Sequence, residues 1–273
     1  MLDDRLDAID DGLIYDVGAH RGEDSDYYLK LGYRVVAVEA NPHLVEWLRE
    51  RFRREIEEGT YTLVPNAIGE RDEEIVFYVN RKNSAWGTTD PDWAARNRLL
   101  GADSEAITVK CVRFIDLLRE HGCPHYLKID IEGADMRCVE DLAGATAMPT
   151  YLSIESSKIS WRALLAEFRT LSALGYTRFK VVDQCHFAKR RIADSDGQII
   201  EYAFGRGASG PFGEDLDGRW LTRNQAIARY IPIFLAYKTM GDNTLLSKVL
   251  VKIPFLNRLL RAVSWYDTHA KKG

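Results

Sequence analysis

The fold is decided by the stretch Leu13-Ile-Tyr-Asp16-Val-Gly18-Ala-His20-Arg-Gly22. Its first five residues are an apolar run interrupted by Asp16, which is typical of a buried strand. Two glycines four residues apart then allow the backbone to turn sharply and to approach a ligand closely. We therefore expect a strand, a tight turn and a helix, the arrangement that opens a nucleotide-binding α/β sheet.

The turn differs from a dinucleotide-binding turn at one position. A dinucleotide site has the pattern G-x-G-x-x-G, whose second glycine lets the backbone approach the pyrophosphate. Here that position is His20, and the pattern is acidic-x-Gly-x-x-x-Gly. S-adenosylmethionine has no phosphate, and its cationic amino-acid end favours a nearby carboxylate such as Asp16. A tight strand–helix turn with no ligand is the alternative interpretation.

A second carboxylate stands at the end of the next predicted strand, residues 34–39. Glu39 lies 21 residues after Gly18, where an acidic side chain can accept hydrogen bonds from both ribose hydroxyls. Pro42 follows and suits the first turn of a helix. Because NAD sites use the same acid, Glu39 indicates adenosine without naming the cofactor. A solvated acid at a strand end is the other interpretation.

Strand and helix patterns alternate along the chain. Strands are expected at 13–17, 34–39, 60–64, 74–79, 107–112, 125–131, 151–155, 179–182 and 199–204. Such alternation indicates a mostly parallel sheet. We expect an α/β fold: a seven-stranded, doubly wound sheet with helices on both faces. The ligand-binding domain should span residues 1–205 with an inserted loop region at 80–105, and a loop and helical extension should fill 206–273.

Charged residues interrupt the apolar strand expected at residues 125–131. In the segment Lys128-Ile-Asp130-Ile-Glu132-Gly133, alternation places the three charged side chains on one side. Buried charges are costly without a partner or a function. The predicted catalytic residues are therefore Lys128 and Asp130, together with His186 as an alternative base. A structural Lys–Asp pair and an Mg²⁺ site at Asp130 and Glu155 are alternatives; no metal is expected, since no His pair has ligand spacing.

Composition and charge bear on the expected partners and on the expected location of the protein. The 273 residues carry a net charge of −4, so a nucleic-acid backbone is not an expected partner. Four cysteines without a C-x-x-C pair suggest reduced thiols and a cytoplasmic location. From Lys238 onward there are seven Lys or Arg and two Asp. This tail either packs on the domain or on a second subunit of a homo-oligomer, or contacts an anionic membrane.

Four segments together resemble the FkbM family of methyltransferases. They are D-V-G-A-H-R-G-E at 16–23, V-V-A-V-E-A-N-P at 35–42, P-N-A-I-G-E at 65–70 and L-K-I-D-I-E-G-A-D at 127–135. The resemblance implies a Rossmann-like class I methyltransferase fold and S-adenosylmethionine as cofactor. It also implies O-methylation of a sugar, polyketide or other natural product, a lipid-linked glycan included.

The resemblance also assigns roles to residues. Cofactor contacts are expected from Asp16, Gly18, His20, Gly22, Glu39, Ala40, Asn41, Asn66, Ala67 and Asp130. Asp16 and the two glycines should line the methionine side, Glu39 the ribose, Asn66 and Ala67 the adenine, and Asp130 the methyl group. His20 replaces an Asn that is usual in the family. An NAD-dependent oxidoreductase and a non-catalytic adenosine-binding module remain the alternative functions.

Overall fold

A computed structural model describes residues 6–240 and 266–273, apart from positions 81, 100, 132, 158–159, 185–186 and 206. The chain divides into two compact units. Unit 1 comprises residues 1–152 and 188–208, and unit 2 comprises residues 153–187 and 209–273. This division does not follow the boundary expected at residue 205, because residues 153–187 group with the C-terminal part of the chain.

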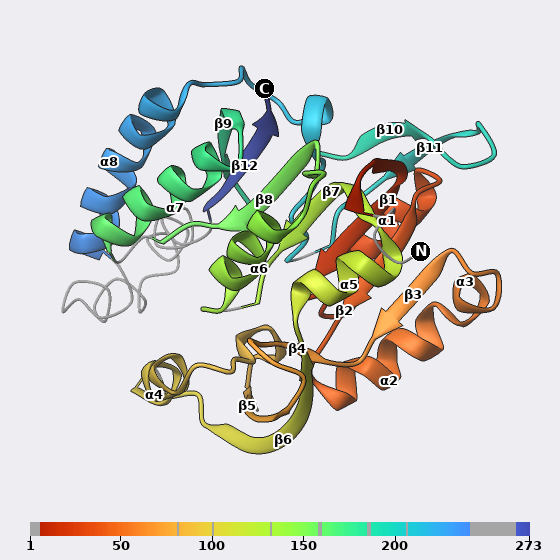
Figure 1. Cartoon of the computed structure of the whole chain (residues 1–273), viewed down its shortest axis with the longest axis horizontal. Helices are drawn as coiled ribbons and strands as arrows, with labels where there is room; N and C mark the ends of the chain where they lie inside the picture. The colour runs from red at the N-terminus through yellow and green to blue at the C-terminus, as the bar shows by residue number, and fades with distance from the viewer. Residues whose placement is uncertain are drawn as a thin grey trace. The chain divides into compact units, whose positions relative to one another are not determined.

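Seven strands form a mostly parallel sheet in the order β3-β2-β1-β7-β8-β12-β9, flanked by helices (Figure 1). The predicted Rossmann-like architecture is therefore confirmed. In unit 1, the strands β1 (Ile9–Val17), β2 (Arg34–Val38), β3 (Tyr61–Val64) and β7 (Cys123–Ile129) all pair in parallel. Their carboxyl ends consequently meet at one edge, where ligands bind in such sheets.

Six α-helices are described in unit 1, and all but α4 follow the strand–helix alternation that the sequence predicts. They are α1 (Glu23–Lys30), α2 (Pro42–Arg51), α3 (Arg53–Glu57), α4 (Pro91–Leu99), α5 (Phe114–His121) and α6 (Asp135–Asp141). The core between strands and helices contains fully buried aromatic and aliphatic side chains such as Ile14, Tyr28 and Leu127. Cys111, Cys123 and Cys138 are buried free thiols, while Cys185 lies outside the described residues.

Two predicted strands belong to a separate sheet. β5 (Glu74–Asn80) pairs antiparallel with β6 (Ser104–Val112), and β6 pairs with the short β4 (Ala67–Ile68). This three-stranded sheet is drawn in orange and yellow in Figure 1. It has its own apolar cluster, in which Ala67, Phe77, Val109 and Cys111 pack together. A local apolar core therefore accounts for a second sheet that strand periodicity alone did not separate from the first.

The inserted region at 80–105 is not only a loop. It contains the 3₁₀ turn η2 (Ser84–Trp86) and the helix α4. The Asp90 carboxylate accepts hydrogen bonds from the backbone N–H groups of Asp92 at 2.7 Å and Trp93 at 3.4 Å. Pro91 stands at the first helical position, and both features start a helix. The expectation of an irregular loop was therefore wrong over residues 91–99.

Unit 2 contains an unexpected strand, β12 (Tyr266–Lys272). It pairs antiparallel with β9 (Tyr176–Asp183) and lies between β8 and β9 in the main sheet. The other elements of unit 2 are α7 (Trp161–Ala173), the 3₁₀ turn η4 (Gly213–Asp215) and α8 (Arg223–Met240), and β8 (Tyr151–Glu155) spans the boundary between the units. Residues 241–265 of the expected helical extension lie outside the described residues. No helix in the described parts of the chain is long and apolar enough to cross a membrane.

The prediction that residues 199–204 form a strand of the main sheet was wrong. Instead, β10 (Arg190–Ala193) and β11 (Ile199–Tyr202) form a two-stranded hairpin in unit 1. The hairpin is fixed by Tyr202, whose ring centroid lies 5.0 Å from that of Tyr27. The Tyr202 hydroxyl also donates to the Asp26 carboxylate at 2.9 Å. Packing on α1 thus takes the place of pairing with the sheet.

Candidate functional site

The turn after β1 is held against two other strands. The backbone N–H groups of Gly18 and Ala19 both donate to the Val38 carbonyl, at 2.9 and 3.0 Å. Gly18 has φ 85°, and a Cβ atom on it would lie 1.8 Å from the Asp130 carbonyl oxygen. No side chain fits there, so glycine is required for the turn to lie this close to the end of β7.

The rest of the turn is shaped by two residues with positive φ. Gly22, at φ 77°, precedes α1, and a Cβ on it would lie 2.3 Å from the Phe52 ring. His20 has φ 51°, a left-handed conformation that histidine tolerates better than most residues with a side chain. The two glycines and His20 therefore adopt the sharp turn that the sequence pattern predicts.

Asp16 is fully buried and bound by protein groups. Its Oδ1 accepts a hydrogen bond from Lys128 Nζ at 2.9 Å, and its Oδ2 accepts one from Ser25 Oγ at 2.6 Å. Lys128 Nζ also donates to the Gly18 carbonyl at 2.9 Å and lies 3.7 Å from Asp24 Oδ2. The Asp16 carboxylate thus pairs with the Lys128 ammonium group, and the hydrogen bonds of Lys128 hold the end of β7 against the turn after β1.

Lys128 is held as a cation. Burial alone would lower its pKa, but Asp16, Asp24 and Asp130 outweigh burial and raise the pKa well above its ordinary value. A protonated ammonium group has no electron pair with which to accept a proton. Its environment therefore suits positioning of the Gly18 turn, and the catalytic role predicted for Lys128 is not one of accepting a proton.

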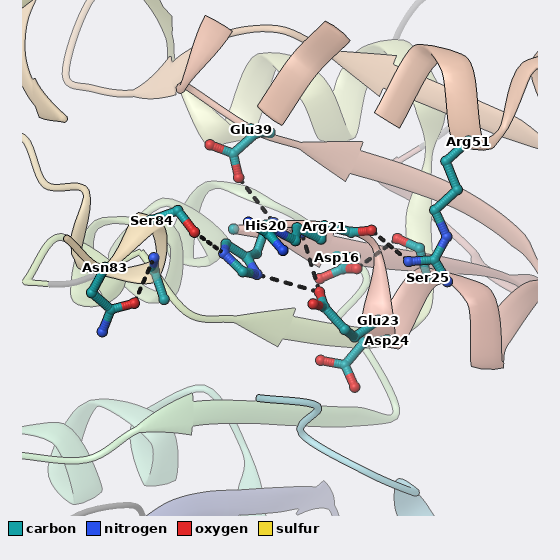
Figure 2. Close-up of polar contacts among 12 residues, drawn as sticks. Asp16, His20, Arg21, Glu23, Asp24, Ser25, Glu39, Arg51, Asn83 and Ser84 are labelled. Carbon is teal, nitrogen blue, oxygen red and sulfur yellow. Dashed lines mark hydrogen bonds and ion pairs between the residues drawn. The ribbon is translucent and has the colours of Figure 1, made fainter. Parts of the chain in front are cut away.

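Glu39 lies buried beside the same turn, after β2 (Figure 2). Its Oε2 accepts the backbone N–H of His20 at 2.9 Å, and its Oε1 accepts that of Asn41 at 2.8 Å. Burial raises the pKa of Glu39 to about 7, although both N–H groups oppose the shift. Each carboxylate oxygen has a second lone pair. The group can therefore accept two further hydrogen bonds, and these would stabilise its charged form.

Neighbouring residues complete this edge of the site. The Asn41 side chain accepts the backbone N–H of His43 at 3.1 Å and so caps α2. Ala40 packs against the apolar cluster that contains Ala67. Ala67 is buried, whereas Asn66 is half-buried. The segment after β2 and the residues around β4 thus meet, as expected for residues that share a ligand.

The segment after β7 forms the other edge. The Asp130 backbone N–H donates to the Val17 carbonyl at 2.9 Å, and its side chain is half-buried. Asp135 accepts the backbone N–H groups of Ile131 at 3.0 Å and Gly133 at 3.2 Å, which fixes the loop. Asp130 therefore lies at the turn beside Gly18. Glu132 and His186 lie outside the described residues.

A contact that sequence reasoning missed joins the insert to the turn. His20 Nε2 lies 2.8 Å from Ser84 Oγ, and His20 Nδ1 lies 3.4 Å from Glu23 Oε2, as Figure 2 shows. The sequence gives no signal for the His20–Ser84 pair, because the residues are 64 positions apart. Within the described part of the chain, no group of three or more His, Cys, Asp or Glu is placed to hold a metal.

Comparison with known proteins agrees with this arrangement. Residues 16–193 match the family described as the Methyltransferase FkbM domain. No curated protein matches the chain.

Solved structures similar to the chain include methyltransferases of low sequence identity. One is a precorrin-6Y C5,15-methyltransferase from Geobacter metallireducens: identity is 13%, the match covers 74% of this chain and 79% of that one, and the TM-score is 0.37. Another is a Burkholderia thailandensis 1,6-didemethyltoxoflavin-N1-methyltransferase with bound 1,6-didemethyltoxoflavin and S-adenosylhomocysteine. Its sequence identity is 14%, the match covers 69% of this chain and 67% of that one, and the TM-score is 0.31. The family match covers well over half of the 273 residues, including the β1 turn, Glu39 and Asp130. The chain belongs to the FkbM family of methyltransferases.

Proposed function

We propose that this protein transfers the methyl group of S-adenosylmethionine to a hydroxyl group of a small molecule such as a sugar or a polyketide. Family membership supports methyl transfer. The observation that carries an adenosine cofactor is Glu39, a buried carboxylate at the carboxyl end of β2 that can accept two further hydrogen bonds. A ribose diol supplies two donors of the kind that this carboxylate can accept.

The electrostatics of Glu39 fit such a ligand. Its pKa of about 7 shows that burial strongly opposes the charge. Hydrogen bonds from two hydroxyl groups would favour the ionised form and lower this pKa. Hydrogen bonds from a diol should therefore contribute more binding free energy at Glu39 than at a solvated carboxylate at a strand end.

The β1 turn suits a ligand without phosphate groups. Gly18 allows close approach of the backbone, but its N–H already donates to the Val38 carbonyl. His20 occupies the position that a dinucleotide site keeps as glycine. These features favour S-adenosylmethionine over NAD, although both share the ribose contact.

The residues of this chain would mainly bind and orient. Glu39 would hold the ribose, the turn of Gly18 and Gly22 the amino-acid end, and the region of Asn66 and Ala67 the adenine. When bound, S-adenosylmethionine supplies an activated methyl group on a sulfonium. Alignment of an acceptor oxygen with that methyl group then accounts for most of the rate enhancement.

Calorimetry with S-adenosylhomocysteine and with NADH tests the proposal. We expect the wild-type protein to bind S-adenosylhomocysteine and not NADH. Glu39→Ala should weaken that binding strongly, because charged hydrogen bonds contribute about 1.5–3 kcal/mol each. Glu46→Ala is the matched control, since Glu46 is an exposed acid of α2. Equal affinity of wild type and a folded Glu39→Ala variant would contradict the assignment.

A further inference from the structure

A carboxylate, an imidazole and a hydroxyl group lie in a row at the β1 turn (Figure 2). Glu23, in the first turn of α1, lies 3.4 Å from His20 Nδ1. Ser84, in the η2 turn of the insert, lies 2.8 Å from His20 Nε2. All three residues belong to unit 1. The row connects the insert to the turn that is proposed to bind the cofactor.

The carboxylate determines which ring nitrogen carries the proton. Burial would raise the pKa of Glu23, but the contact with His20 and the backbone N–H of Arg21 outweigh burial and lower the pKa. An ionised carboxylate only accepts hydrogen bonds, so the neutral His20 ring must donate from Nδ1. Nε2 then carries the lone pair, and the Ser84 hydroxyl donates to it. In this tautomer the Ser84 hydroxyl is the donor and His20 Nε2 the acceptor of the 2.8 Å contact.

The ring is held in place but remains accessible. The His20 backbone N–H is bound by Glu39 at 2.9 Å, and the residue is fixed in a left-handed conformation. Its side chain is 29% exposed. The ring therefore has a fixed backbone and a side chain that solvent reaches, and it lies next to the proposed ribose carboxylate.

We propose that His20 is the general base of the methyl transfer, with Glu23 as its positioning residue. This inference rests on the proposed function. The acceptor hydroxyl would take the place at Nε2 that the Ser84 hydroxyl occupies. Histidine is the side chain used most often for this role, and a positioned base accelerates a reaction by about 10²–10⁴-fold.

The step is balanced in atoms and charge. The acceptor oxygen forms a bond to the methyl carbon while the carbon–sulfur bond breaks, and the electron pair of that bond stays on sulfur. The hydroxyl proton moves to His20 Nε2. The resulting imidazolium would be stabilised by Glu23 at Nδ1 and, at longer range, by Glu39. The positive charge of Lys128 is bound by Asp16 and Asp24.

The protonation pattern can be tested without an acceptor. ¹⁵N-labelled histidine gives separate NMR shifts for the two ring nitrogens, and loss of a signal in His20→Asn assigns His20. In the neutral ring of the wild type, we expect the proton on Nδ1. Glu23→Gln should shift the population toward the form with the proton on Nε2. A wild-type ring with its proton on Nε2 would overturn the proposal.

Rates test the role in catalysis. The probes are a panel of methyl glycosides and phenols, supplied with methyl-labelled S-adenosylmethionine. His20→Asn is the informative variant, because Asn also tolerates a left-handed backbone. It should lose at least about 10²-fold in rate. Asn keeps the backbone N–H that binds Glu39, so the affinity for S-adenosylhomocysteine should change by less than about threefold, which is under 1 kcal/mol.

A matched control comes from the same unit. His125 Nδ1 lies 3.2 Å from the Asp11 carboxylate, near the amino end of β7, so His125→Asn should change neither rate nor affinity. A His20→Asn rate close to wild type, or a large loss in Asp130→Asn alone, would reject His20 as the base. If wild type binds no S-adenosylhomocysteine, the proposed function itself fails; normal binding with the wrong ring proton rejects only this inference.

Discussion

Lys128→Met should destabilise the protein by about 3–5 kcal/mol, the cost of removing one partner of a buried ion pair. Asp16 has no exposed surface, and the Lys128 side chain is 5% exposed. The variant would leave the Asp16 carboxylate buried with Ser25 as a donor but without the Lys128 cation. The Gly18 carbonyl would also lose its hydrogen bond from Nζ. Methionine is similar in length to the lysine stem, so loss of packing contributes little.

Urea denaturation measures this cost. The midpoint should fall while the slope with denaturant stays constant, which identifies a change in stability. Lys30→Met is the control: Lys30 and Asp26 are 2.6 Å apart, but their side chains are 42% and 24% exposed. A pair this exposed is worth at most about 1 kcal/mol. Adding Asp16→Asn to Lys128→Met should restore part of the loss. A Lys128→Met cost no larger than that of Lys30→Met would refute the reasoning.

Two further predictions concern the turn and Glu39. Gly18→Ala should abolish binding of S-adenosylhomocysteine in calorimetry, because the new Cβ would lie 1.8 Å from the Asp130 carbonyl oxygen. Gly59→Ala is the control and should bind S-adenosylhomocysteine normally. Gly59 also has a positive φ, 76°, but no atom lies within 4 Å of its Cβ position. Glu39, with a pKa of about 7, binds its proton more tightly in the folded than in the unfolded state. Its contribution to stability therefore falls as pH rises from about 4.5 to 7, by about 3 kcal/mol over the whole window. Urea midpoints at pH 5 and pH 8 should show this fall in wild type and a smaller one in Glu39→Gln.

Local sequence patterns predicted the strands and the turn that form one half of the candidate site. The β1 strand, its glycine turn and the acid after β2 lie within a single strand–helix–strand unit, so periodicity and turn chemistry suffice to place them. The parallel pairing of Asp16 with Ala37 then brings the turn and Glu39 to the same edge. Asp130 lies beside Gly18 for the same reason, since β7 pairs with β1.

The remaining features depend on contacts between distant residues. β12 has the sequence YDTHAKK, whose polar residues gave no strand signal, yet Asp267, Thr268 and His269 are buried. The Thr268 hydroxyl lies 2.7 Å from the Tyr230 hydroxyl, and the Asp267 carboxylate accepts a hydrogen bond from the Gln184 side chain. Likewise, the sequence indicates that Asp16 is a candidate site residue. It does not show that the Asp16 carboxylate pairs with Lys128, which is 112 positions away. Patterns within a window cannot identify such partners.

The pairing of β9 with β12 also has a consequence for biosynthesis. Asp183 pairs with Tyr266, so 83 residues must be made after β9 before its partner emerges from the ribosome. At translation rates of about 5–20 residues per second, β9 would wait on the order of several seconds with its pairing groups unmatched on that side. An unpaired strand edge is a template for association with other chains. Newly made protein should therefore be most prone to aggregate in this interval, when unit 1 has all its strands and unit 2 still lacks β12.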